Sequence, residues 1–225
     1  DEKLCEQGRN FSNKIWNAFR LVKGWEIDEQ KDGAENAVSI AWFEARFNEA
    51  LAEIEDHYSK FRISNALMTL YKLIWTDFCS WYLEMIKPAY QQPIDRPTYE
   101  KTLEFFEKLM KVLHPLMPFL TEELWHEIRE RGEEDCMIVA EYPKPEAFET
   151  AILEEAAFVF EVIANVRNVR NEKQIPKNNP LKLAIKTQEA AVYEKFEGVL
   201  KKLAGLESIE FVSEQVEGAA RFVQK

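Results

Sequence analysis

Large apolar residues recur at steps of three and four through residues 1–131, and this spacing constrains the fold more than any other feature of the sequence. On an α-helix such spacing makes one apolar stripe, which must be buried against other helices. The alternating pattern of a half-buried strand is absent from the same stretch. Pro97 and Pro118 stand where helices are expected to begin, because proline fits the first helical turn. The spacing therefore predicts an all-α helical bundle, which we assign to residues 1–148.

The pattern changes in the last third of the chain. A long helix is expected from about Thr150, and the later segments 181–187, 208–213 and 220–224 have the character of strands. We therefore expect a second module at residues 149–225, in which the long helix is joined to a small α/β unit with short antiparallel strands. The predicted fold class is mainly α.

One predicted helix is unusually rich in aromatic residues. It is expected to run from Ser64, as its N-cap, to Lys87, and Trp75, Phe78 and Tyr82 lie on it at steps of three and four. Aromatic rows of this kind are core far more often than they are ligand platforms. We therefore expect this helix to be central, with the row buried against several neighbours.

The net charge of −11 argues against indiscriminate nucleic-acid binding, because such binding needs a basic field. The charge is unevenly distributed, however. Acidic residues dominate 28–56 and 122–155, whereas basic residues gather at 9–23 and 167–186. A polyanionic partner would have to contact the two basic regions and avoid the rest, which requires both regions to fold onto one flank.

The common signatures of catalysis and metal binding are absent from the sequence. There is no phosphate-binding glycine loop and no G-x-S-x-G nucleophile motif. Cys5, Cys79 and Cys136 are too widely spaced for a disulfide framework or a C-x-x-C metal pair. No apolar run approaches the ~20 residues that a membrane-spanning helix needs. We expect no catalytic residue, metal or cofactor in this chain, and a reduced, cytoplasmic setting.

The helix expected over residues 8–23 has a polar side of unusual composition. Its apolar stripe consists of Phe11, Ile15, Ala18, Phe19 and Val22. The other side carries three asparagines and three cations: Arg9, Asn10, Asn13, Lys14, Asn17 and Arg20. Asparagine is a mediocre helix former because its amide competes for backbone hydrogen bonds, so this concentration needs a reason. Leu21 is the one apolar residue in the row that contains Asn10, Lys14 and Asn17.

Two interpretations of this polar side are open. In the first, it is a surface that donates and accepts hydrogen bonds beside positive charge, which suits phosphates and base edges. In the second, it is a polar seam whose amides bridge to a neighbouring helix while the cations are solvated. Periodicity alone favours the seam.

Several runs of the sequence resemble a known family. They are RNFSNK at 9–14, WN at 16–17, FCSWYLE at 78–84, HP at 114–115, PFLTEELW at 118–125, VRNVR at 166–170 and PL at 180–181. In this order and spacing, the chain resembles the anticodon-binding region of class I aminoacyl-tRNA synthetases, and within that class the valyl-specific family. Singly, some of the runs are shared with isoleucyl and leucyl relatives, and an isoleucyl-type relative stays an alternative.

The resemblance implies binding of the anticodon stem and loop of a valine-specific tRNA. The residues it implies as tRNA-binding are Arg9, Asn10, Asn13, Lys14, Asn17, Arg20, Leu21, Arg167, Arg170, Lys173 and Lys177. At Leu21 this chain departs from its relatives, which usually carry an aromatic residue there that could stack on a base.

The resemblance also implies a division of labour in a longer protein. The family's adenylation motifs, His-x-Gly-His and Lys-Met-Ser-Lys-Ser, are absent here, as is its editing domain. ATP would therefore be used by a catalytic domain of the same protein, upstream of these residues. The sequence also starts without Met, in the middle of a charged helical pattern, so we expect a piece of something longer. The alternative of a different class is a helical interaction module whose polar faces meet another protein domain.

Overall fold

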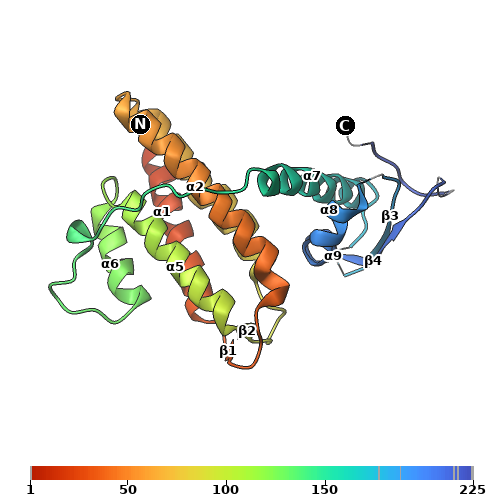
Figure 1. Ribbon diagram of the computed structural model, residues 1–225, viewed down its shortest axis with the longest axis horizontal. Coiled ribbons are helices and arrows are strands. Elements are labelled where there is room, and N and C mark those ends of the chain that lie inside the picture. The colour runs from red at the N-terminus through yellow and green to blue at the C-terminus, as the bar shows by residue number, and fades with distance from the viewer. Residues whose placement is uncertain (1, 177, 188, 215, 217, 224–225) are drawn as a thin grey trace. The chain divides into compact units, whose positions relative to one another are not determined.

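In the computed structural model shown in Figure 1, the chain forms two compact units, residues 1–148 and 149–225. The structure describes residues 2–176, 178–187, 189–214, 216 and 218–223.

The first unit is built almost entirely from helices, as predicted. Its α-helices are α1 (Glu2–Lys23), α2 (Ala37–Ser59), α3 (Ile63–Lys72), α4 (Leu83–Ile86), α5 (Arg96–Leu113) and α6 (Pro118–Ile128). Its other elements are the 3₁₀ turns η1 (Ala34–Asn36) and η3 (Met137–Val139), the π-helix η2 (Leu73–Tyr82), and the two-residue strands β1 (Ile27–Asp28) and β2 (Ile94–Asp95). The two strands pair in parallel. Asp95 caps α5, because its carboxylate accepts a 2.7 Å hydrogen bond from the Thr98 N–H.

The core of the first unit is a cluster of aromatic rings from α2, η2 and α5. Its members are all at most 1% exposed: Phe43, Phe78, Tyr82, Phe105 and Phe106. Phe43 lies 5.1 Å from Phe78 and 4.9 Å from Phe105 between ring centroids, and Phe78 meets Phe106 edge-on at 4.7 Å. Edge-to-face pairs of this kind add about 0.5–1.5 kcal/mol each beyond the area that they bury. The cluster therefore fixes α2, η2 and α5 against one another.

The aromatic-rich helix is not a single α-helix. It ends at Ile86, with Lys87 as its C-cap ahead of Pro88, one residue before the expected end. It begins at Ile63 and no side chain caps it, so the predicted N-cap at Ser64 is wrong. Its middle, Leu73–Tyr82, is π-helical, with backbone bonds spanning five residues rather than four. The Ser80 hydroxyl donates a 2.9 Å hydrogen bond to the Trp75 carbonyl, which is also five residues away. The wider turn changes which residues share a face.

A buried ion pair ties the π-helix to α2. The Arg46 Nε donates to the Asp77 carboxylate at 2.9 Å, and the guanidinium also contacts Glu49. Burial raises the pKa of Asp77, and the Arg46 cation offsets this only in part. Desolvation by itself lowers the pKa of Arg46, but the two carboxylates outweigh it and raise that pKa. The pair is partly buried, so each side chain lowers the cost of keeping the other's charge away from water.

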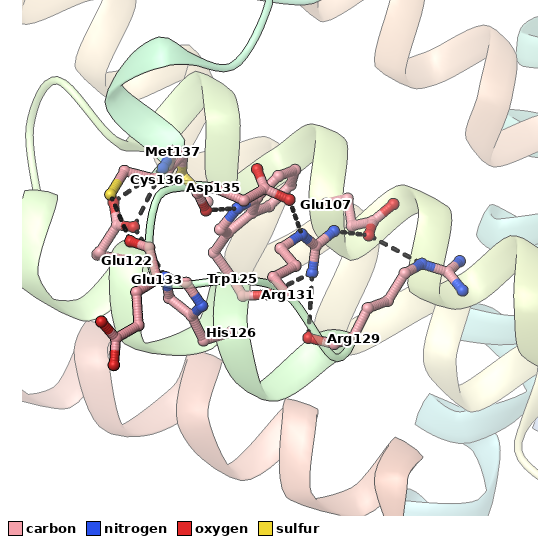
Figure 2. Close-up of polar contacts among 10 residues, drawn as sticks. All are labelled: Glu107, Glu122, Trp125, His126, Arg129, Arg131, Glu133, Asp135, Cys136 and Met137. Carbon is pink, nitrogen blue, oxygen red and sulfur yellow. Dashed lines mark hydrogen bonds and ion pairs between the residues drawn. The ribbon is translucent and has the colours of Figure 1, made fainter.

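The segment after α6 is held in place by side chains of α5 and α6, as Figure 2 shows. The Trp125 indole N–H donates to the Asp135 carbonyl at 2.9 Å, and the Arg131 guanidinium lies 3.5 Å from the centre of the Trp125 ring. Arg131 also pairs with Glu107, and the Glu122 carboxylate accepts the Met137 N–H at 3.0 Å. These contacts fix the position of residues 129–136, which form no helix or strand.

The second unit joins a long helix to a small two-stranded sheet (Figure 1). Its elements are α7 (Ala151–Glu172), β3 (Leu181–Ile185), α8 (Ala190–Lys195), α9 (Glu197–Ala204) and β4 (Leu206–Phe211). The prediction of antiparallel strands is wrong, because β3 and β4 pair in parallel. Parallel neighbours need a crossover connection, and α8 and α9 provide it. Residues 220–223 form no strand, contrary to the prediction for 220–224, and residue 224 lies outside the described residues.

Replacing Arg46 by Leu should destabilise the first unit by about 3–5 kcal/mol, because Asp77 would keep a buried charge without its cation. Urea unfolding measures this loss. Burial raises the pKa of Asp77 in the folded chain, so the folded state holds that proton more tightly than the unfolded state. Removing Arg46 takes away the cation that lowers this pKa, so the pKa is higher still in the variant and protonation stabilises the variant more than the parent. The loss should therefore shrink as the pH falls.

The double variant Arg46→Leu/Asp77→Leu is the matched control and should recover much of the loss. Equal stability of the Arg46→Leu variant and the parent would contradict a structural role for the pair.

Candidate nucleic-acid interface

The polar side of α1 faces solvent. The predicted stripe of Phe11, Ile15, Ala18, Phe19 and Val22 is buried, at 0–7% exposure, so the orientation of the helix follows the prediction. The candidate residues on the other side are exposed: Arg9, Asn10, Asn13, Asn17 and Arg20. Within the described part of the chain, their side chains make no hydrogen bond or ion pair. The interpretation as a polar seam is therefore wrong for the described residues, among which none of these amides bridges to a neighbouring helix.

Aromatic contacts on the buried side hold α1 rigidly. Phe11 stacks on Tyr71 at 4.9 Å, and Phe19 meets Phe106 edge-on at 6.0 Å. These rings come from α3 and α5, so the helix is fixed against two different partners. The exposed amides are thus presented at the fixed spacing of a helix and do not depend on a mobile loop.

Of the other two candidates on this side, Lys14 is not fully exposed and Leu21 is apolar. Lys14 is half-buried, and its ammonium lies 5.5 Å from the centre of the Trp75 ring. Leu21 is exposed, so its side chain is accessible to a ligand. The sequence between Arg9 and Lys23 contains four cations and no acidic residue. The side is therefore locally basic on a chain of net charge −11.

Arg170 has a structural role that the sequence did not reveal. It is 6% exposed, and its guanidinium donates to four carbonyls: those of Ala204 at 3.0 Å, Pro176 at 3.0 Å, Asn179 at 2.9 Å and Gly205 at 2.6 Å. A guanidinium carries five N–H donors, so most of its capacity is used inside the protein. We therefore correct the prediction that Arg170 contacts tRNA.

The remaining candidates of the second unit lie in different environments. Arg167 is exposed, and its Nε donates to the Leu203 carbonyl at 3.1 Å. Lys173 is exposed at the C-terminal end of α7. Lys177 lies outside the described residues. The two basic regions belong to different units, so the expectation that they share one flank stays a prediction.

Trp75 lies outside the core, so the prediction that places it there with Phe78 and Tyr82 is wrong. It is half-buried and lies beside Lys14, whereas the other two are fully buried. The π-helical turn separates Trp75 from that row. The periodicity of an α-helix gives no signal for such a turn, so the sequence pattern could not have indicated this position.

The described residues offer little to other kinds of site. They contain no group of three or more His, Cys, Asp or Glu side chains placed to hold a metal ion. None of the described helices combines the length and the apolar run needed to cross a membrane.

The sequence matches a family model over residues 41–185, and the family is described as the anticodon-binding domain of tRNA ligase. The match covers more than half of the chain, so the chain belongs to this family. The matched stretch begins within α2 and therefore leaves out α1, which carries most of the candidate residues.

Similar proteins extend the comparison to α1. The chain is 48% identical over 223 residues to the valine–tRNA ligase of Christiangramia forsetii, with 99% of this chain and 25% of that protein covered. It is 46% identical over 224 residues to the valine–tRNA ligase of Parabacteroides distasonis, with the same coverage. The valine–tRNA ligase of Fusobacterium nucleatum is 33% identical over 222 residues, covering 92% of this chain and 25% of that protein. The chain thus spans about a quarter of the length of these relatives.

Replacing Arg170 by Met should destabilise the second unit, because four carbonyls would lose their donor, at a cost of about 1–3 kcal/mol for each one that is left buried and unsatisfied. Thermal unfolding measures the loss. Arg167→Met, one turn earlier on α7, is the matched control and should lose about 1 kcal/mol or less, since its side chain is exposed. Similar losses for the two variants would contradict the distinction between them.

Proposed function

We propose that this chain binds the anticodon stem and loop of a valine tRNA, as the anticodon-binding part of a longer valine–tRNA ligase. The observation that carries the proposal is the exposed side of α1, where three asparagine amides and the guanidinium groups of Arg9 and Arg20 face solvent without partners among the described residues. Membership of the anticodon-binding family and identities of 43–48% to valine–tRNA ligases support it.

The chemistry of this side suits a single-stranded loop held on a stem. Asparagine amides donate and accept hydrogen bonds, so they can pair with the exposed edges of unstacked bases. Arg9 and Arg20 can neutralise phosphates, and guanidinium groups contact phosphate oxygens in pairs. Leu21 can pack on a base face but has no π-system for stacking. On this proposal base recognition comes mainly from amides and Lys14.

The strongly acidic remainder of the chain limits where RNA can bind. Phosphates are repelled from most of a molecule with net charge −11, so only a locally basic side can hold them. In the second unit, Arg167 and Lys173 are the exposed candidates for contacts with phosphates. We propose no catalytic residue and no cofactor within this chain, and we assign the use of ATP to another part of the ligase. Its free cysteines fit a reduced cytoplasmic setting.

The variants Lys14→Ala and Asn17→Ala test the proposal, with binding of a valine tRNA anticodon stem-loop as the measurement. Each should weaken binding by about 1–3 kcal/mol if it removes a contact that reads a base. Both should leave the unfolding midpoint close to that of the parent. Arg20→Ala should instead reduce the salt dependence of binding, because it removes a phosphate contact.

Matched controls separate local contacts from a general change of charge. Lys31→Ala removes one cation outside α1, and Asn65→Ala removes one exposed amide on α3; neither should alter the affinity by much. Unchanged binding by both test variants would remove α1 as the docking surface. No salt-dependent binding by the parent chain would overturn the proposed function and favour a helical interaction module.

A further inference from the structure

Lys14 is the one candidate cation on α1 that is not freely solvated. Its side chain is half-buried, and the ammonium lies over the Trp75 ring, 5.5 Å from the ring centre. In the part of the chain that the structure describes, no carboxylate pairs with it. Arg9 and Arg20, by contrast, are exposed and have no such neighbour. The neighbour of the Lys14 ammonium is therefore the face of the Trp75 indole and not a carboxylate.

Trp75 is itself held in place by two contacts, one to its ring and one to its backbone. Its ring is nearly parallel to that of Tyr71, with an interplanar angle of 12° and a centroid distance of 5.6 Å. Tyr71 stacks in turn on Phe11 of α1, at 4.9 Å. The Trp75 backbone carbonyl accepts the Ser80 hydroxyl within the π-helical turn. Three stacked rings, those of Phe11, Tyr71 and Trp75, thus connect the buried side of α1 to the ring that lies under Lys14.

An aromatic partner has a chemical advantage over an acidic one at an RNA-binding lysine. A carboxylate would neutralise the ammonium and compete with the phosphate or base that it is meant to bind. The face of an indole attracts a cation through its quadrupole and leaves the positive charge intact. The three N–H donors of the ammonium also remain available to RNA.

We propose that Trp75 is a positioning residue for tRNA recognition, which holds the Lys14 ammonium on the RNA-binding side of α1 before RNA arrives. The inference rests on the proposed function, in which Lys14 contacts the anticodon loop. A free lysine side chain loses rotamer freedom when it binds, and this loss weakens binding. Trp75 confines Lys14 in the unbound chain, so less freedom is lost in the complex.

The test compares Trp75→Phe with Trp75→Leu, because Phe keeps an aromatic face and Leu keeps only apolar bulk. Trp75→Leu should weaken binding of a valine tRNA anticodon stem-loop by a factor of about 2–10, the range expected for one side chain that must be ordered on binding. Trp75→Phe should keep most of the parent affinity. A purely structural role would make the two variants differ in unfolding midpoint but not in affinity.

A double-mutant cycle with Lys14→Met identifies the route by which Trp75 acts. If Trp75 acts through Lys14, Trp75→Leu should have no further effect on affinity in the Lys14→Met chain. An equal loss in both chains would overturn the inference, because Trp75 would then act independently of Lys14. No loss in the parent chain would overturn it as well.

NMR of the free chain gives a readout that does not depend on RNA. The ε-methylene protons of Lys14 should be shifted upfield by the indole ring in the parent, less so in Trp75→Phe, and not in Trp75→Leu. A parent spectrum without this shift overturns the inference even if RNA binds. A parent chain that shows the shift but binds no stem-loop overturns the proposed function, and the role of Trp75 in recognition with it.

Discussion

The burial of one side of α1 is the constraint on which the rest of the structure depends. Phe11 packs on Tyr71 of α3, and Phe19 packs on Phe106 of α5, which belongs to the aromatic core. Packing of the apolar stripe fixes the rotation of α1 about its own axis, so it also fixes the direction in which the polar side points. Hydrophobic packing in the first unit therefore determines which amides and cations meet solvent. Apart from Lys14, which lies over Trp75, the candidate polar residues of this side make no hydrogen bond or ion pair among the described residues, which leaves their composition free for binding.

The features set by simple periodicity could be predicted from the sequence. The stripe of α1 and the all-α character of residues 1–148 follow from apolar spacing alone, because burial of a stripe is a property of each helix by itself. Spacing could not choose between a polar seam and an RNA surface on the same helix. That choice depends on whether another helix covers Asn10 and Asn17, and such packing is long-range.

The wrong predictions for Trp75, for the direction of β3 and β4 and for Arg170 each concern a feature that local periodicity does not encode. The π-helical turn at 73–82 moves Trp75 out of its expected row, and the pattern of an α-helix cannot reveal a change of helical type. The strand direction of β3 and β4 depends on the crossover through α8 and α9, whereas the alternation within each strand is the same for either direction. Arg170 looked like a surface cation because it is charged. Its carbonyl partners come from segments 6 to 35 positions away, and a local pattern does not contain them.

The hydrogen bonds of Arg170 to four carbonyls also affect how the second unit unfolds locally. One planar guanidinium joins the end of α7 to Pro176, Asn179 and the turn at Gly205. Three stretches that share a single hub cannot detach one at a time without leaving donors or acceptors unsatisfied. Amide protons near these carbonyls should consequently exchange with solvent in one cooperative event. Lysine at this position would keep the charge but not the fork of donors, so the stretches would then fray separately.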